Sequence, residues 1–322
     1  ALTVYFFWKG INFNKKIDWI LFGVFSALGF LSKYLFIYIL IAFFIFLVLN
    51  FRKYNKSIKN YSLSILISLI LLIPHFIWLF ENNFITINYG LARSDISNFN
   101  LINHIKNPAL FLFKQIIILI PFFLMAYSVI NKFKFKINIK DKETLFLLTI
   151  NLIPILLMLI TSILTGAKIR TMWMTPFYLF LGTLFLFIFK KGIELKKIKN
   201  FYYVFLFFFI ISPSIYLGVS LVDKTKRTDY PGKEISRLVQ NKWDDNFVNE
   251  IKIVIGDEWS AGNLSYHLYS RPIWINDLKN NTVNITEDKG VIYTGNPKIL
   301  KKICPGVFGT IKPVGYCMIG RR

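Results

Sequence analysis

Long apolar stretches constrain this chain more than any other feature of its sequence. Most are close to the roughly 20 residues that a helix needs to cross the hydrocarbon core of a bilayer. Helices are the form in which one apolar segment satisfies all its backbone groups in lipid, so the pattern predicts a mainly α, polytopic transmembrane bundle. The stretches are Trp19–Leu49, Tyr61–Phe80, Leu110–Ile130, Leu145–Thr165, Thr171–Phe189 and Phe201–Leu221.

Composition supports a membrane protein. Of the 322 residues, 55% are apolar and only 17% are charged. Soluble globular chains run nearer 45–50% apolar and about 25% charged. The same values exclude a disordered chain, a collagen, a coiled coil and a small disulfide scaffold.

The stretch Trp19–Leu49 differs from the others because it is too long for one span and short for two. Lys33 interrupts it near the middle. We expect two short helices with Lys33 near their turn.

The net charge of +22 invites a nucleic-acid interpretation, but the basic residues lie mainly between apolar runs. Short cytoplasmic loops of membrane proteins retain Lys and Arg. Alternate loops differ in basic content, and this difference predicts that residues 222–322 lie outside the cytoplasm. No nucleic-acid partner is expected. The basic-rich loops are Lys9–Lys16, Arg52–Lys59, Lys132–Lys142 and Lys190–Lys199, and the opposite set is Lys33, Arg93, Lys106, Lys114, Lys168 and Arg170.

The amino-terminal apolar run, Leu2–Trp8, is short for a span. At 1.5 Å per residue it covers only ~12 Å, less than half of a bilayer core. We therefore expect residues 1–221 to be the second part of a transmembrane domain whose first spans precede Ala1.

Residues 222–322 lack long apolar runs and predict a small soluble α/β domain. Expected helices are Lys233–Asn241 and Ala261–Ser270, and expected strands are Lys252–Ile255, Arg271–Asn276 and Gly290–Thr294. Cys304 and Cys317 are the only cysteines. An oxidising compartment favours a disulfide between them, two unpaired buried thiols being the alternative, and no metal site is expected.

Ionisable groups next to spans are the default functional candidates, because they are costly in lipid unless paired or wet. The loop after Tyr61–Phe80 carries Asn82 and Tyr89, whose polar and aromatic character suits sugar or headgroup contacts; a plain solvated loop is the alternative. The ionisable residues that we assign to the outer face are Lys33, Glu81, Arg93, Asp95, His104, Lys106, Lys168 and Arg170.

Three cations among them are candidates for binding a phosphate. Lys33 at the lipid–water boundary can neutralise a lipid phosphate, or it can simply mark the turn. Lys168 and Arg170 precede Trp173 in a short loop. They can stabilise a leaving phosphate, or the loop can serve as an interfacial anchor.

Four segments together resemble the bacterial membrane glycosyltransferases related to protein O-mannosyltransferases and the lipid A aminoarabinose transferase. Each is weak alone, and their order carries the resemblance. They are Gly23–Tyr34 (GVFSALGFLSKY), Pro74–Asn82 (PHFIWLFEN), Ala167–Pro176 (AKIRTMWMTP) and Asp257–Pro272 (DEWSAGNLSYHLYSRP).

The resemblance implies a GT-C fold in a bacterial inner (plasma) membrane, with an active site that faces away from the cytoplasm. Such enzymes move a sugar from a polyprenyl-phosphate carrier to a lipid, glycan or protein acceptor. Lys33 corresponds to the family's LxKy lysine, and Arg170 and Trp173 to its basic and aromatic motif. Lys168 joins the phosphate-binding set, and the proposed substrate-binding set is Tyr34, Trp78, Glu81, Asn82, Tyr89, Arg93 and Trp173.

The general base of the family is an Asp in the first outer loop, which we expect upstream of Ala1. Inverting transfer needs a carboxylate and electrostatic support for the departing phosphate, so no redox cofactor is implied. A divalent cation near the phosphates is compatible with this chemistry, although the sequence shows no ligand cluster for it.

Two alternatives remain at this point. A transporter or flippase of lipid-linked sugars would use the same outward cations without breaking a bond, although repeated halves with broken helices, frequent in transporters, are not visible. A structural subunit would only carry the outer domain and would not depend on Lys33 or Arg170.

Overall fold

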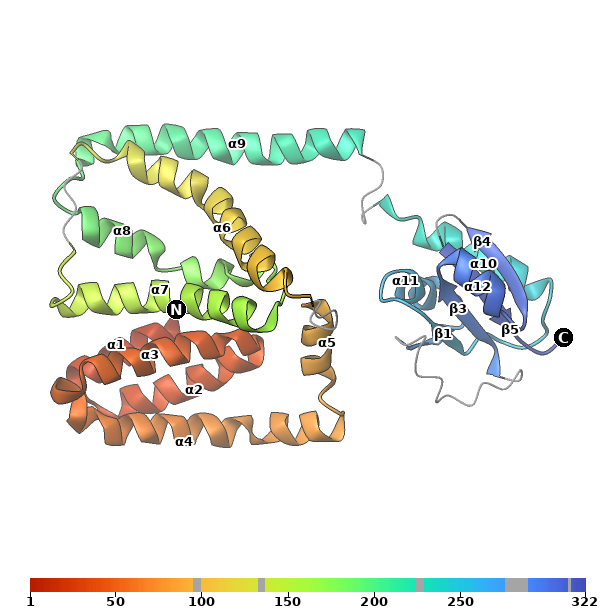
Figure 1. Ribbon diagram of the computed structural model, residues 1–322, viewed down its shortest axis with the longest axis horizontal. Coiled ribbons are helices and arrows are strands. Elements are labelled where there is room, and N and C mark those ends of the chain that lie inside the picture. Colours follow the sequence, from red (N-terminus) through yellow and green to blue (C-terminus); the bar gives the residue numbers. More distant parts are fainter. Residues whose placement is uncertain (95–99, 133–136, 224–228, 276–288, 312–313) are drawn as a thin grey trace. The chain divides into compact units, whose positions relative to one another are not determined.

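The computed structural model describes residues 1–94, 100–132, 137–223, 229–275, 289–311 and 314–322. Asp95 and Asn276, which the sequence singled out, lie outside these ranges. Contacts divide the chain into two units, Ala1–Pro213 and Ser214–Arg322, each described here by itself (Figure 1).

The first unit is helical throughout its described regular elements. Its α-helices are α1 (Leu2–Phe13), α2 (Lys16–Ser32), α3 (Ile37–Leu49), α4 (Phe51–Glu81), α5 (Ile85–Arg93), α6 (Asn103–Ser128), α7 (Lys142–Thr165), α8 (Leu181–Phe189) and α9 (Ile198–Val222), the last of which continues into the second unit. Short 3₁₀ turns connect them: η1 (Tyr34–Phe36), η2 (Thr171–Trp173), η3 (Thr175–Tyr178) and η4 (Leu195–Lys197).

Among the described residues, four helices are long and apolar enough to cross a membrane: Ser57–Glu81, Asn103–Ser128, Lys142–Thr165 and Leu195–Val222. They differ in how much of their apolar surface other protein segments cover. In the most apolar 18-residue segment of α7, 39% of the residues are buried, whereas none are buried in the corresponding segment of the helix that contains α9. Apolar side chains left uncovered to this extent require lipid. The chain is therefore an integral membrane protein, in which other described segments cover α7 in part and leave α9 uncovered.

The turn predicted at Lys33 is confirmed. Helix α2 ends at Ser32, Lys33 adopts an extended backbone, and η1 leads directly into α3. Gly29 makes this close turn feasible, since a Cβ there would lie 2.6 Å from the ring of Phe36. The sequence therefore places one cation where two apolar helices meet.

The prediction of one continuous span over Thr171–Phe189 is wrong. The structure has two 3₁₀ turns, η2 and η3, before the nine-residue helix α8. Pro176 lies in the first turn of η3, a position at which its missing backbone N–H costs no helical hydrogen bond. The break leaves Trp173 in a turn.

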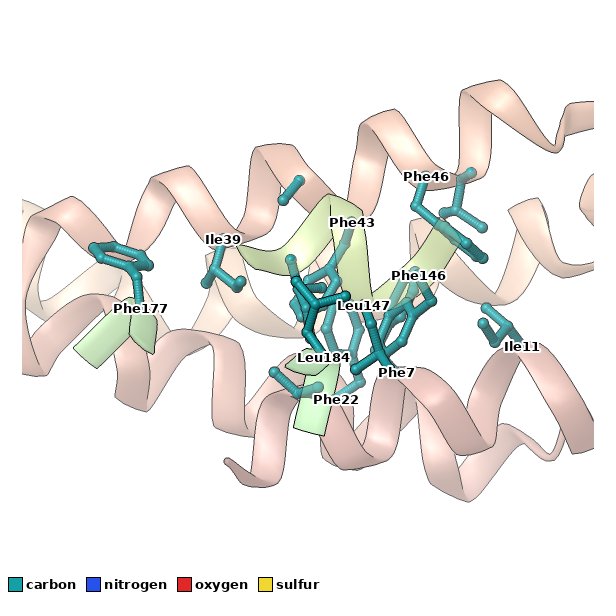
Figure 2. Close-up of a cluster of buried hydrophobic side chains, with 14 of the residues drawn as sticks. Phe7, Ile11, Phe22, Ile39, Phe43, Phe46, Phe146, Leu147, Phe177 and Leu184 are labelled. Carbon is teal, nitrogen blue, oxygen red and sulfur yellow. The ribbon is translucent and has the colours of Figure 1, made fainter. Parts of the chain in front are cut away.

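Aromatic rings form the core of the first unit (Figure 2). Phe7 of α1 stacks on Phe43 of α3, with ring centroids 4.3 Å apart, and on Phe146 of α7 at 6.0 Å. Phe7 and Phe43 are fully buried. Stacked rings of this kind add about 0.5–1.5 kcal/mol per pair beyond their area burial, so this cluster ties α1 and α3 to α7.

The second unit is a small α/β domain. Its elements are α10 (Gly232–Asp244), β1 (Ile253–Ile255), α11 (Ser260–His267), β2 (Ile273–Ile275), β3 (Val291–Gly295), α12 (Pro297–Ile303), β4 (Val307–Ile311) and β5 (Val314–Ile319). The strand order is β2-β1-β3-β5-β4, with β1 parallel to β2 and β3 and with β5 antiparallel to β3 and β4. The predicted helices and strands of this region are present, whereas α12, β4 and β5 were not foreseen.

A disulfide joins Cys304, at the end of α12, to Cys317 in β5. This is the pairing that the sequence favours over two free thiols. The bond closes a loop with a sequence separation of 13. It connects the end of α12 to β5, which lies between β3 and β4 in the antiparallel part of the sheet.

Removal of the disulfide is expected to lower the free energy of unfolding of the second unit by about 3 kcal/mol, the chain-entropy value for a loop of roughly 15 residues. The measurement is the unfolding midpoint of the Cys304→Ser/Cys317→Ser variant against wild type, each with and without reductant. Reductant should destabilise only the wild type. An equal response of both proteins would show that the bond contributes nothing.

Asp257 caps the loop between β1 and α11. Its Oδ1 accepts hydrogen bonds from the backbone N–H of Trp259 at 2.8 Å and of Ser260 at 3.0 Å, and its Oδ2 accepts one from the Ser260 hydroxyl. Partial burial opposes ionisation, but the bonds from Ser260 and Trp259 prevail and lower the pKa of Asp257. The ionised carboxylate therefore stabilises the fold.

This lowered pKa predicts a pH-dependent stability. The contribution is fully present above the unfolded-state pKa of about 3.9 and is lost as the pH falls through the lower folded-state value. Between pH 5 and pH 3, wild type should lose more stability than Ser260→Ala, which lacks the hydroxyl that donates to Asp257 Oδ2. Thermal unfolding at both pH values measures the difference, and parallel losses would contradict the assignment.

Candidate functional site

Lys33 is one of the residues that line a cavity of the first unit with a volume of about 700 Å³. This size falls within the roughly 300–1,000 Å³ of typical ligand pockets. Most of the lining is apolar and comes from α1, α2, α3, α7 and η3. Lining residues include Phe25, Leu28, Phe36, Ile39 and Phe177. The cavity therefore combines an apolar interior with a cation at its edge.

The Lys33 ammonium is anchored by a contact that the sequence did not predict. Its Nζ donates a hydrogen bond to the backbone oxygen of Trp173 at 3.2 Å, across 140 residues of chain. Burial lowers the pKa of Lys33 because the charged form loses water. Among the described residues no carboxylate pairs with this ammonium. A partly desolvated cation without an anion is a favourable place for an anionic ligand.

Polar side chains anchor the loop that carries Trp173 to α6. Gln115 of α6 is almost fully buried, its Nε2 lies 3.4 Å from the Thr171 oxygen, and its Oε1 accepts a 2.7 Å hydrogen bond from the Tyr178 hydroxyl. These contacts fix η2 and η3 relative to α6. Gln115 and Tyr178 thereby act on Lys33 through Trp173, and sequence reasoning missed both because their partners lie far along the chain.

The Tyr34 side chain makes its contacts on the other side of the turn that carries Lys33. Its hydroxyl lies 2.9 Å from His75 Nε2 and 2.7 Å from Thr86 Oγ1. The His75 ring stacks on Trp78, with centroids 5.9 Å apart. Consecutive residues Lys33 and Tyr34 thus connect the turn to η2 on one side and to α4 and α5 on the other. His75 was part of a segment that carried the family resemblance but was not chosen as a site residue.

The end of α5 joins this region through its backbone. The Lys168 N–H donates to the Ser94 oxygen at 2.8 Å, so the loop before η2 lies against the residue that follows Arg93. The Arg93 guanidinium lies over the Tyr89 ring, 4.7 Å from its centroid. Cations in this position gain about 0.5–1 kcal/mol at exposed sites. Tyr89 and Arg93 are therefore neighbours, as a shared site requires.

Other predicted residues are exposed and contribute less to this arrangement. Glu81 and Asn82 lie at the C-terminal end of α4, and the Asn82 amide donates to the Trp78 oxygen of that helix at 2.8 Å. Lys168 and Arg170 are exposed, and Arg170 contributes its backbone oxygen to the turn that positions Trp173. His104 contacts the Ile163 oxygen at 2.6 Å.

The described residues contain no cluster of three or more His, Cys, Asp or Glu side chains that could hold a metal ion. We therefore assign no metal-binding role to any residue of the site.

Comparison with protein families adds an independent line of evidence. Residues 1–78 match the model of the dolichyl-phosphate-mannose-protein mannosyltransferase family. The match supports a GT-C-type, mannosyltransferase-like membrane protein. It confirms the resemblance predicted from the sequence and covers Lys33, Tyr34, His75 and Trp78. No curated protein and no solved structure matches the chain. The mannosyltransferase-like region thus contains the Lys33 turn and most of α4, and it supports a membrane glycosyltransferase in general.

Proposed function

We propose that this protein transfers a sugar from a polyprenyl-phosphate donor to a lipid, glycan or protein acceptor on the extracytoplasmic face of the membrane. The observation that carries the proposal is the position of Lys33 at the edge of a large apolar cavity. An isoprenoid phosphate has the matching chemistry, since it joins a long apolar tail to an anion. The mannosyltransferase family match supports the same donor class.

In this proposal the Lys33 ammonium binds the phosphate that becomes the leaving group. Negative charge on that phosphate increases as the bond to the sugar breaks, and a fixed cation stabilises it most at that stage. The Trp173 oxygen holds Lys33 in place, and Lys168 and Arg170 supply further positive charge on the neighbouring loop. Tyr89 and Arg93 of α5, together with Trp78 and Glu81, bind the sugar and the acceptor in this proposal.

The extracytoplasmic orientation is supported by two observations on the chain. The basic loops concentrate on the side opposite to Lys33, as cytoplasmic loops do. The disulfide between Cys304 and Cys317 is typical of an oxidising compartment, such as the space outside the inner membrane.

The test is incubation of the full-length protein in lipid nanodiscs with a labelled polyprenyl-phosphate sugar and a mixture of envelope lipids as acceptors. A transferase releases free polyprenyl phosphate and forms a glycosylated product. A flippase or transporter would return the donor intact. Recovery of uncleaved donor from folded protein with envelope lipids, and with glycan and protein acceptors in separate reactions, would overturn the proposal.

A further inference from the structure

A second cavity, of about 500 Å³, lies entirely within the second unit. Helix α10 and the segment that follows the body of α11 form its walls, and the two helices pack against each other (Figure 1). We call it the α10 groove. It shares no residue with the Lys33 site. Its lining residues are Lys233, Glu234, Ser236, Arg237, Gln240, Asn241, His267, Leu268 and Tyr269.

The helical repeat explains why polar side chains of α10 gather here. Lys233, Arg237 and Gln240 follow one another at intervals of four and three residues, which places them on one face. The opposite face carries Val239 and Trp243, both buried in the core of the unit. Packing of the apolar residues in the core therefore determines which face of α10 lines the groove. The polar face of α10 remains accessible.

Two cations of the groove form no ion pair with a carboxylate of the described residues, although Glu234 also lines the groove. Neither Lys233 nor Arg237 forms an ion pair within the described ranges, although Glu234 is next in sequence to Lys233. The two cations lie one helical turn apart. Arg recognises carboxylate and phosphate groups through paired hydrogen bonds, and Lys acts as a point charge beside it. An anionic group fits between them.

The lining of the groove also includes the Gln240 amide and the Tyr269 ring. Gln240 donates from Nε2 to Asp244 Oδ1 at 2.8 Å, but its buried Oε1 has no partner among the described residues. Buried amide oxygens are normally hydrogen-bonded, so a small rotation of this amide would pair it with a ligand hydroxyl. Tyr269 is 96% exposed and presents its ring without contact to the core.

Gly232 sets the distance between the two walls. A Cβ at this position would lie 2.9 Å from Cδ2 of His267. Because Gly232 has no side chain, the start of α10 approaches His267 closely, and the imidazole forms part of the groove. This adds a further donor or acceptor near Lys233.

We infer that the α10 groove binds an acidic saccharide, that is, a short glycan bearing carboxylate or phosphate groups. Lys233 and Arg237 hold the anion, Gln240 and Asn241 bind ring hydroxyls, and Tyr269 packs against a sugar ring. Apart from Leu268, the lining side chains are polar, charged or aromatic. This composition favours a hydroxyl-rich ligand over a peptide that needs pockets for apolar side chains.

The experiment is isothermal titration of the full chain in phosphatidylcholine nanodiscs with trigalacturonate, maltotriose and hexaglutamate. Trigalacturonate should bind saturably, and the neutral maltotriose and the acidic peptide should each bind at least about tenfold more weakly. Equal affinity for trigalacturonate and maltotriose would show that charge is not recognised. Equal affinity for hexaglutamate would show that the glycan is not recognised. Either result, or no saturable binding, would overturn the inference.

Variants assign the binding to this groove. Arg237→Gln and Lys233→Gln should each weaken trigalacturonate binding about tenfold. Lys301→Gln removes an equally exposed cation from α12, outside the groove, and should leave the affinity unchanged. Equal effects of all three would contradict the site, and an unchanged unfolding midpoint verifies that each variant is folded. Failure here leaves the Lys33 site untouched, since the two share no residue.

Discussion

Lys33→Gln should reduce the initial rate of polyprenyl-phosphate release by about a hundredfold in the full-length protein. The substitution removes the cation at the edge of the apolar cavity while keeping a side chain that can donate to the Trp173 oxygen. Loss of one preorganised group that stabilises transition-state charge typically costs 10²–10³-fold in rate. The measurement is the release of label from the donor, with the unfolding midpoint as a check on folding.

Two further variants make this result specific. Lys33→Arg retains the charge and should recover part of the rate. Lys106→Gln removes an exposed cation at the start of α6, which contributes no contact to the site, and should leave the rate unchanged. If Lys33→Gln keeps the wild-type rate within about threefold, Lys33 does not bind the leaving phosphate.

Lys9→Met should lower the free energy of unfolding by about 3 kcal/mol. The Lys9 Nζ lies 3.2 Å from Asp18 Oδ1, and the Asp18 side chain is 2% exposed. Removal of the cation leaves a buried carboxylate without compensation, which usually costs 3–5 kcal/mol. We use the lower end because the Lys9 side chain is 35% exposed. Thermal unfolding of the solubilised protein measures the change.

The control for this substitution is Lys15→Met, which removes an exposed cation from the loop between α1 and α2. Exposed substitutions of this type usually change stability by less than about 0.5 kcal/mol. The double variant Lys9→Met/Asp18→Asn removes the charge as well as its partner and should recover most of the loss. Equal midpoints for Lys9→Met and Lys15→Met would mean that the pair contributes nothing to stability.

Local patterns predicted most of the helical framework. Apolar length identified α4, α6, α7 and α9, and a single charge within an apolar run identified the turn at Lys33. These features depend on residues close in sequence. The break before α8 was not predicted, because apolar composition alone does not locate the ends of a helix.

The site was predictable only in part, because its contacts join distant segments. A cation at position 33 is visible in the sequence, whereas its bond to Trp173 depends on how α6 and α7 pack. His75 reaches Tyr34 across 41 residues, and no periodicity within either segment signals this contact. In the second unit, α12, β4 and β5 are short elements whose pairing is likewise determined by the whole sheet.

Photocrosslinking tests most directly whether the cavity beside Lys33 holds the isoprenoid carrier. The full-length protein in nanodiscs would be irradiated with a diazirine-labelled polyprenyl phosphate, and the modified residues would be identified by mass spectrometry. We predict adducts on cavity-lining residues such as Phe25, Leu28 and Phe177, reduced by excess unlabelled carrier. Adducts confined to the lipid-exposed surfaces of α4 and α9, with none in the cavity, would contradict the proposal.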